Sequence, residues 1–283
     1  MTANRPLIAL LAAACFAPLL ATGTYQMQVL NISLLNAIVV LGLNYVTGWT
    51  GQINFGQAAF YGLGAYAAGI AAKAGVPWIL TPLISVAVVI PASLALGVPT
   101  LRLRTYYLAM TTIGFGEIVR LVIVHWEPVT GGTSGLRNIP GISLAGFQVK
   151  GEIAHFYVLL AVLALAALAA WRIRNSALGR AMLATRDSEI AAELSGVDTV
   201  KIKIIAFMLA AVYAGLAGCL YASSIHYISP DSFTGTQAVL LMTMLIMGGM
   251  GSIPGSIVGA IGLTILPEAL RFLGQWYLVL YGL

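Results

Sequence analysis

Long apolar runs follow one another along almost the whole sequence, and a single long polar stretch, residues 171–203, interrupts them. Hydrophobic residues make up 60% of the 283 residues and charged residues 8%, whereas soluble domains carry about 25% charged residues. A helix needs about 20 apolar residues to cross a membrane, because lipid offers no partner to main-chain N–H and C=O groups. The sequence therefore excludes a soluble fold and predicts an all-α, polytopic transmembrane helical bundle with residues 1–283 in a single domain.

The polar interruption concentrates the charge of the chain, since it holds ten of the 23 charged residues. Within it, residues 181–194 are good helix formers, and we expect one short amphipathic helix there. Its apolar stripe would consist of Leu183, Ile190 and Leu194. Gly196 is expected to end the helix, because glycine readily adopts positive φ. Such a helix either docks into a groove on a soluble partner or is a solvated or interfacial loop, and the residue types allow both.

Basic residues gather on one side of the expected spans. If the spans alternate in direction, one side holds Arg5, Arg102, Arg104, Arg172, Arg174, Arg180, Arg186, Lys201 and Lys203, and the other holds Lys73, Arg137 and Lys150. Because cytoplasmic loops carry the excess of Lys and Arg, residues 172–203 are predicted to be a cytoplasmic segment. This bias also accounts for the net charge of +5, so a nucleic-acid partner is not predicted.

The first apolar run, 7–21, is either a membrane span or a cleaved signal peptide, because its length fits both. The next run, 29–46, carries three amide side chains that should face the inside of the bundle, where they find partners: Asn31, Asn36 and Asn44. The remaining candidate spans are 79–98, 106–126, 156–171 and 204–223, followed by two shorter runs at 238–247 and 256–273.

Two glycine-rich segments, 48–69 and 248–255, are predicted to be broken or re-entrant. Glycines allow either tight helix packing or a break that lines a cavity, and both interpretations stay open here. An offset of 200 residues relates several glycines of the two segments, a weak hint of an internal repeat. Broken helix ends and amides suit the charged ends of a zwitterion. The candidate translocation-pathway residues are Asn44, Gln52, Asn54 and Gln57.

Charged side chains inside the apolar runs are few. Glu117 and Arg120 lie three residues apart on one helical face near the outer end of a span, which favours a structural ion pair over a functional interior. His226 and Asp231 lack a third ligand or a nucleophile, so we expect them to be turn and surface residues. No metal site and no catalytic residues are predicted.

Nucleotide-binding and hydrolytic motifs are absent from the sequence. It contains no G-x-x-x-x-G-K-[ST] loop, so this chain cannot by itself bind ATP in the usual P-loop manner. Neither HExxH nor GxSxG occurs. We therefore expect no enzymatic activity and no cofactor in this chain.

Five motifs occur in order along nearly the whole chain: GWTGQINFGQAAFYGLGAY, YLAMTTIGFGEIVRLV, TGGTSGL, LGRAMLATRDSEIAAELSGV and GGMGSIPG. Together they resemble the LivM-like permeases of branched-chain amino-acid ABC importers. The resemblance implies a multi-pass protein of the bacterial inner (plasma) membrane. It also implies four partners: a second homologous permease subunit, two cytoplasmic ABC ATPase subunits that bind the ATP, and a periplasmic solute-binding protein.

The polar stretch resembles the EAA coupling motif through which ABC permeases contact their ATPases. The candidate coupling residues are Arg186, Glu189, Ala191, Ala192 and Gly196. The later I-x-L-P half of that motif is not evident after Gly196, which leaves the docking contacts open. The implied solutes are branched-chain or related hydrophobic amino acids, and relatives handle urea, short amides or aromatic acids. The alternatives of another class are a stand-alone channel or ion-coupled carrier, and a membrane-embedded enzyme.

Overall fold

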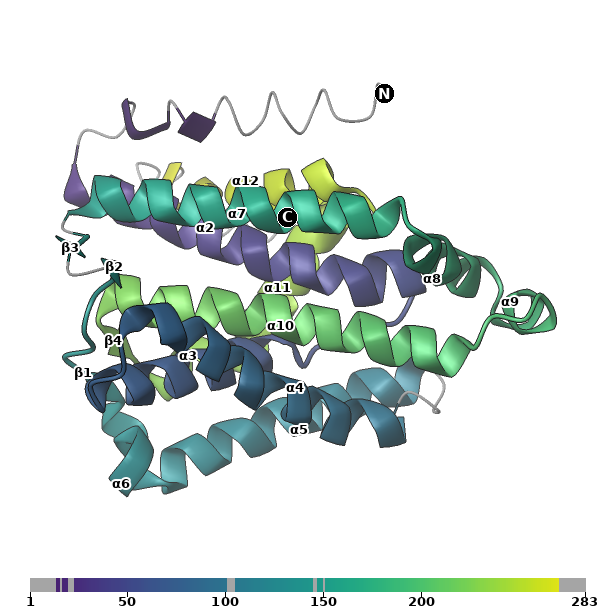
Figure 1. The fold of residues 1–283 in the computed structure, drawn as a ribbon, viewed down its shortest axis with the longest axis horizontal. Coiled ribbons are helices and arrows are strands. Elements are labelled where there is room, and N and C mark those ends of the chain that lie inside the picture. The colour runs from purple at the N-terminus through teal and green to yellow at the C-terminus, as the bar shows by residue number, and fades with distance from the viewer. Residues whose placement is uncertain are drawn as a thin grey trace.

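The structure is a computed structural model that describes residues 14–15, 17–19, 23–100, 105–144, 147–149 and 151–269, and helices make up almost all of it (Figure 1). The longer helices are α2 (Thr24–Leu43), α3 (Gln57–Lys73), α4 (Thr81–Thr100), α5 (Thr105–His125), α7 (Glu152–Arg174), α8 (Ala177–Asp187), α10 (Thr199–Ile225), α11 (Gly235–Gly248) and α12 (Ile253–Ala269). Most of the apolar run 7–21 lies outside the described residues, and so do the basic residues Arg5, Arg102, Arg104 and Lys150.

Short elements connect these helices. The helical ones are η2 (Ala17–Leu19), the π turn η3 (Asn44–Gly48), η4 (Trp78–Leu80), α6 (Glu127–Thr130), η5 (Gly132–Ser134), α9 (Glu189–Leu194) and η6 (Pro230–Phe233). Four two-residue strands form two antiparallel pairs, β1 (Leu136–Arg137) with β4 (Tyr227–Ile228) and β2 (Ser143–Leu144) with β3 (Phe147–Gln148). The strands lie at the end of the bundle opposite α8 and α9 (Figure 1).

Five helical segments among the described residues are long and apolar enough to cross a membrane. They are Thr24–Gly48, Trp78–Thr100, Tyr107–His125, Glu152–Arg174 and Thr199–Ile225. Each contains or nearly coincides with a run predicted from the sequence, which confirms the all-α polytopic bundle. Helices α11 and α12 are shorter, and a tight turn at 249–252 separates them.

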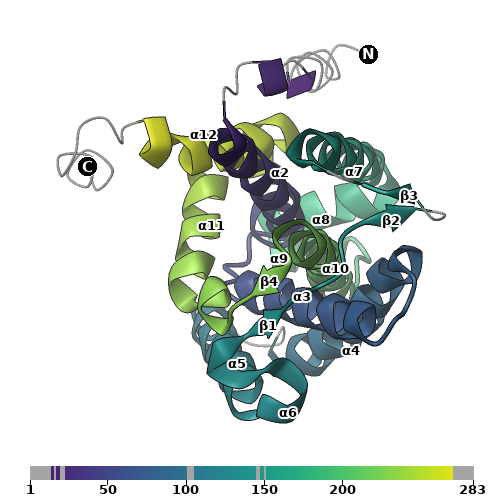
Figure 2. The same cartoon turned by 90° about the vertical axis from the view of Figure 1, so that its left-hand side faces the viewer.

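Helix α10 is the centre of the bundle, where it packs against α2, α3 and α4 (Figure 2). Its buried face consists largely of alanine and glycine, so neighbouring main chains approach it closely. A Cβ added at Gly64 of α3 would lie 2.5 Å from the Cα of Gly215. The close-packing interpretation therefore holds for the α3 part of the first glycine-rich segment.

The three amides of α2 face the protein interior, as predicted. Asn31, Asn36 and Asn44 are at most 5% exposed. Asn31 Nδ2 donates to the Glu152 carboxylate at 2.7 Å, and Asn36 Nδ2 donates to Thr264 Oγ1 at 3.1 Å. These bonds fix α2 against α7 and α12, because a buried amide without a partner would be costly.

The prediction of one amphipathic helix over 181–194 is wrong. The chain forms α8 and α9, and Ser188 between them has extended backbone angles, φ −160° and ψ 111°. Ser188 Oγ accepts a hydrogen bond from the N–H of Ala191 and so caps α9, which a serine does well at a helix start. The expected apolar stripe is divided as a result: Leu183 packs against the core, whereas Leu194 is 85% exposed.

Candidate functional site

Two breaks in the helices meet at one place. The first comprises residues 44–56, where α2 ends in a π turn and non-helical chain leads to α3, and the second comprises residues 248–252 between α11 and α12. Asn44 Oδ1 accepts a hydrogen bond from the N–H of Gly251 at 2.8 Å, and Trp49 Nε1 donates to the Gly251 carbonyl at 3.2 Å. We call residues 44–56 and 248–252 together the joint. The weak sequence echo between the two glycine-rich segments thus coincides with a contact between them.

The joint requires glycine at two positions. A Cβ on Gly48 would lie 2.7 Å from the main-chain nitrogen of Gly251 and closer still to the Asn44 side chain. Gly251 itself has φ +87°, a conformation that residues with a Cβ rarely adopt. The glycines therefore permit both the close approach of the two breaks and the sharp turn at the second one.

Arg186 of α8 reaches into the joint and donates from Nη1 to the Gly48 carbonyl at 2.5 Å. The position of the same Nη1 is 3.0 Å from where a Cβ of Gly251 would be. Gly48 ends the helix that begins with α2, so its carbonyl has no partner within that helix and carries partial negative charge. A guanidinium is favourable there, and it ties α8 to the first break, close to Gly251 of the second.

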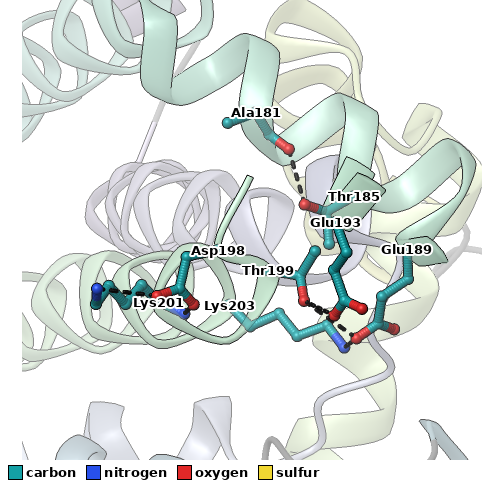
Figure 3. A network of polar contacts seen from close by, with 8 residues as sticks. All are labelled: Ala181, Thr185, Glu189, Glu193, Asp198, Thr199, Lys201 and Lys203. Carbon is teal, nitrogen blue, oxygen red and sulfur yellow. Dashed lines mark hydrogen bonds and ion pairs between the residues drawn. The ribbon is translucent and has the colours of Figure 1, made fainter. Parts of the chain in front are cut away.

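A second set of contacts ties α9 to α10 (Figure 3). Lys203 of α10 forms an ion pair with Glu189 of α9, and the Lys203 side chain is only 7% exposed, compared with 48% for Glu189. Thr199 Oγ1 donates to the Glu193 carboxylate at 2.7 Å. A buried ammonium needs such a partner, because its desolvation is otherwise uncompensated. The short helix α9 is therefore fixed to the first turns of α10.

Asp198 begins α10 and caps it. Its carboxylate accepts a hydrogen bond from the N–H of Lys201 at 3.1 Å and forms an ion pair with the Lys201 ammonium at 2.9 Å. The hydrogen bonds from the side chain and then the main chain of Lys201 hold the pKa of Asp198 below its ordinary value. The start of α10 thus keeps an ionised cap at neutral pH.

The outer face of α9 is apolar and uncovered. Ile190 is 73% and Leu194 is 85% exposed, although α9 lies outside all five segments able to span a membrane. Of the remaining candidate coupling residues, Ala191 is exposed, Ala192 is buried, and Gly196 is exposed with φ +83° after the end of α9. The positive φ of Gly196 confirms its predicted role in ending the helix.

The amides of the first break and of the first residue of α3 are buried in the protein. Gln52, Asn54 and Gln57 are at most 4% exposed. Gln57 Nε2 donates to the Ala210 carbonyl at 2.9 Å, and Asn54 Oδ1 accepts from the N–H of Gly56 at 2.8 Å. Each of the three keeps one polar atom, Gln52 Oε1, Asn54 Nδ2 or Gln57 Oε1, without a hydrogen-bond partner among the described residues. These side chains hold the break in place beside α10.

The predicted ion pair of α5 is present, and it has a third member. The Arg120 guanidinium lies 3.0 Å from the Glu117 carboxylate and 3.4 Å from the carboxylate of Asp231, a residue of η6. His226 is the left-handed residue that ends α10, and its Nδ1 lies 2.9 Å from the Ile139 carbonyl. The prediction that His226 and Asp231 are turn and surface residues is confirmed.

Lys203 and Asp231 were not singled out as site residues from the sequence. Lys203 had a signal, because a lysine within an apolar helix must find either solvent or an acid. Its partner Glu189 lies 14 residues away, and Asp231 lies 111 residues from Arg120. Only the fold brings these side chains together.

These helices, breaks and ties define a polytopic membrane protein whose two interrupted helices are connected to a helical unit outside the spans. Residues 25–283 match the family described as the permease component of branched-chain amino acid transport systems, and the chain belongs to that family. The chain is thus a multi-pass membrane permease, and the resemblance seen in the motifs is confirmed.

Individual relatives agree with the family. The chain is 32% identical to the high-affinity branched-chain amino acid transport system permease protein LivM of Salmonella typhimurium, covering 91% of this chain and 66% of that protein. It is also 32% identical to LivM of Escherichia coli (strain K12), covering 98% of this chain and 70% of that protein. A more distant relative, 29% identical over 79% of this chain and 64% of its own length, is the autoinducer 2 import system permease protein LsrC of Yersinia pseudotuberculosis. No solved structure matches the chain.

Proposed function

We propose that this chain is the permease subunit of an ATP-driven importer in a bacterial inner membrane. Its solute is a branched-chain or related hydrophobic amino acid delivered by a periplasmic binding protein. It pairs with a second homologous permease, and two cytoplasmic ATPase subunits bind and hydrolyse the ATP. Family membership and the LivM relatives support a role in transport. The unit formed by α8 and α9 supports the coupling of the permease to ATPase subunits.

One observation carries the coupling role: the α8–α9 unit is apolar outside and tied to the transmembrane bundle inside. Ile190 and Leu194 face away from the protein, whereas Arg186 and Glu189 bond to the joint and to α10. An uncovered apolar face beyond the spans fits a groove on a soluble partner better than it fits water. In this proposal Ala191 and Gly196 belong to the surface that contacts the ATPase, and Ala192 packs beneath it.

Motion would pass from the ATPases through two ties. When the ATPases close on ATP, they displace α8 and α9, and Arg186 and the Glu189–Lys203 pair carry that displacement to the joint and to α10. Both breaks then move, and the half-helices beyond them reorient the solute path between its two accessible states. Asn44, Gln52, Asn54 and Gln57 would hold the wall of that path in register.

The charge distribution supports a cytoplasmic position for α8 and α9. Six basic residues lie at their end of the described chain: Arg172, Arg174, Arg180, Arg186, Lys201 and Lys203. The opposite end has fewer, so the bias typical of cytoplasmic loops favours this orientation. The loops with the four short strands would then face the periplasm and the binding protein.

The test replaces both exposed apolar residues of α9 with lysine in the full complex, in which the chain is co-expressed with its ATPase and binding-protein subunits. We expect Ile190→Lys together with Leu194→Lys to abolish co-purification of the ATPases and ATP-dependent leucine uptake into proteoliposomes. The matched control is Ile153→Lys, an exposed apolar residue in the first turn of α7 at the opposite end.

Two results would overturn the proposal. If the double variant retains the ATPases and normal uptake, α9 is not their docking surface. If the wild-type chain alone passes leucine at the same rate without ATP or partner subunits, it is a stand-alone channel or carrier. Uptake of urea, short amides or aromatic acids in preference to leucine would reassign the solute.

A further inference from the structure

A cavity of about 310 Å³ lies between α3, α5 and α11, outside the α8–α9 unit. Its wall is almost entirely apolar and includes Phe55, Ile113, Phe233 and Val239. Among the described residues that line it, Glu117 is the one with an ionisable side chain. A carboxylate on a span is costly unless something compensates its charge, so its position on this wall calls for a partner.

The charges around Glu117 do not cancel. Arg120 is shared between Glu117 and Asp231, which gives two carboxylates and one guanidinium. The cluster therefore carries one net negative charge. Glu117 Oε1 accepts the bond from Arg120, and its other oxygen makes no hydrogen bond within the described part of the chain. The Glu117 side chain is 54% exposed, so a cation inside the cavity can reach it.

The opposite polarity is present on the same wall. Thr234 and Gly235 line the cavity and begin α11, and no side chain of the described residues caps that helix. Its first N–H groups are therefore free to bond an anion, and they carry partial positive charge. Ala58 and Ala59, in the first turn of α3, also line the cavity. A negative pole and a positive pole thus face one apolar space.

We propose that this cavity binds an α-amino acid with an apolar side chain during transport. Its ammonium group would bond to Glu117, its carboxylate would lie at the first turn of α11, and its side chain would pack against Phe55, Ile113 and Val239. This inference rests on the proposed function, because it names the place where the permease holds the solute. It also selects among solutes, since urea and other neutral amides offer no cation to Glu117.

The charge also favours a solute over other occupants. A lipid chain, or an apolar helix of a second permease, would supply no counter-ion for the net negative charge of the cluster formed by Glu117, Arg120 and Asp231. An amino acid supplies that counter-ion together with the anion for α11. Phe55 belongs to the joint as well as to the cavity wall, so movement of the joint would change the shape of the site.

The experiment measures access to the cavity by chemical labelling of the assembled complex. Val239→Cys places a thiol on the wall, where the native residue is 54% exposed, in a background in which the exposed Cys15 is replaced by serine. The native Cys219 is buried. We measure the rate of labelling by N-ethylmaleimide with L-leucine, with leucinamide, or with 4-methyl-2-oxopentanoate, which lacks the ammonium group.

L-leucine is expected to slow labelling of Val239→Cys, about tenfold when it is present at ten times its Kd. The keto acid should give no protection, and leucinamide should give less than leucine because it lacks the carboxylate. Glu117→Gln should abolish protection by leucine. Two matched controls are Glu127→Gln, another carboxylate at the same end of the bundle, which should leave protection intact, and Ile118→Cys, an exposed position on α5 outside the cavity lining, which leucine should not protect.

Three outcomes would overturn the inference. Protection that persists in Glu117→Gln, or that the keto acid reproduces, would remove the role of the carboxylate. Protection that depends on the second permease but not on leucine would make the cavity a subunit contact. ATP-dependent leucine uptake is measured on the same preparations: uptake that survives Glu117→Gln unchanged refutes the site and leaves the proposed function standing, whereas wild-type complex without leucine uptake refutes the function itself.

Discussion

At the scale of single residues, Arg186 makes the contact that connects α8 to the joint. Its guanidinium bonds to the free carbonyl at the end of the α2 helix, and hydrogen bonds to charged groups contribute about 1.5–3 kcal/mol. Arg186 is exposed over part of its surface, so we expect a value at or below the lower end of that range. The sequence predicted Arg186 as a coupling residue, but its acceptor Gly48, 138 residues away, had no signal in the sequence.

We expect Arg186→Ala to separate hydrolysis from transport. The ATPases would still dock through the outer face of α9 and hydrolyse ATP. Leucine uptake per ATP would fall about tenfold, which corresponds to a loss of ~1.4 kcal/mol of coupling free energy between α8 and the joint. Arg180→Ala is the matched control, because Arg180 lies on the same helix and bonds only to the nearby Asn175 carbonyl among the described residues. Equal uptake per ATP in wild type and Arg186→Ala would contradict the proposed link.

Replacing Glu189 and replacing Lys203 should destabilise the protein to different extents. Glu189→Gln leaves the buried ammonium of Lys203 without its counter-ion, whereas Lys203→Met leaves a carboxylate that is already half exposed. We therefore expect Glu189→Gln to be the more destabilising change, by about 1–3 kcal/mol. Thermal unfolding of the purified complex measures it, and the double variant should recover most of the loss. A larger drop in Tm for Lys203→Met would refute this assignment of buried and exposed partners.

At the scale of helices and breaks, the sequence predicted a good deal. Runs of about 20 apolar residues predict spans well, because lipid imposes both length and composition. The glycine-rich segments also predicted breaks. The division of 181–194 at Ser188 was missed, since helix formers lie on both sides and one capping serine decides the outcome. The contact between the two breaks could not be predicted, because it depends on how α2 and α12 pack.

The second break tests whether the joint depends on its backbone conformation. Gly251→Ala introduces a Cβ at φ +87° beside the Arg186 guanidinium, and a non-glycine residue in the left-handed region costs roughly 1–2 kcal/mol. Hydrogen–deuterium exchange of residues 248–252 should become faster, and uptake should fall. Gly262→Ala is the control, because its Cβ would meet no atom of the described residues within 4 Å. Unchanged exchange in Gly251→Ala would show that the turn does not need glycine.

At the scale of the whole molecule, the bundle is unevenly covered. Helices α2 and α10 are largely buried, whereas α5 lies at one edge of the bundle (Figures 1 and 2). Large apolar side chains of α5 are exposed there. Lipid or a second permease can cover such a face, since both are apolar. The cavity beside Glu117 opens between α5 and its neighbours. The least covered part of the bundle therefore also contains the net negative charge that needs a counter-ion.

Phe55 stands in both the joint and the cavity wall, and this shared residue has a thermodynamic consequence. If nucleotide binding to the partner subunits changes the affinity of this site for the solute by some factor, then solute binding must change the affinity for nucleotide by the same factor. A loaded transporter would therefore bind nucleotide with a different affinity from an empty one, with no separate sensor.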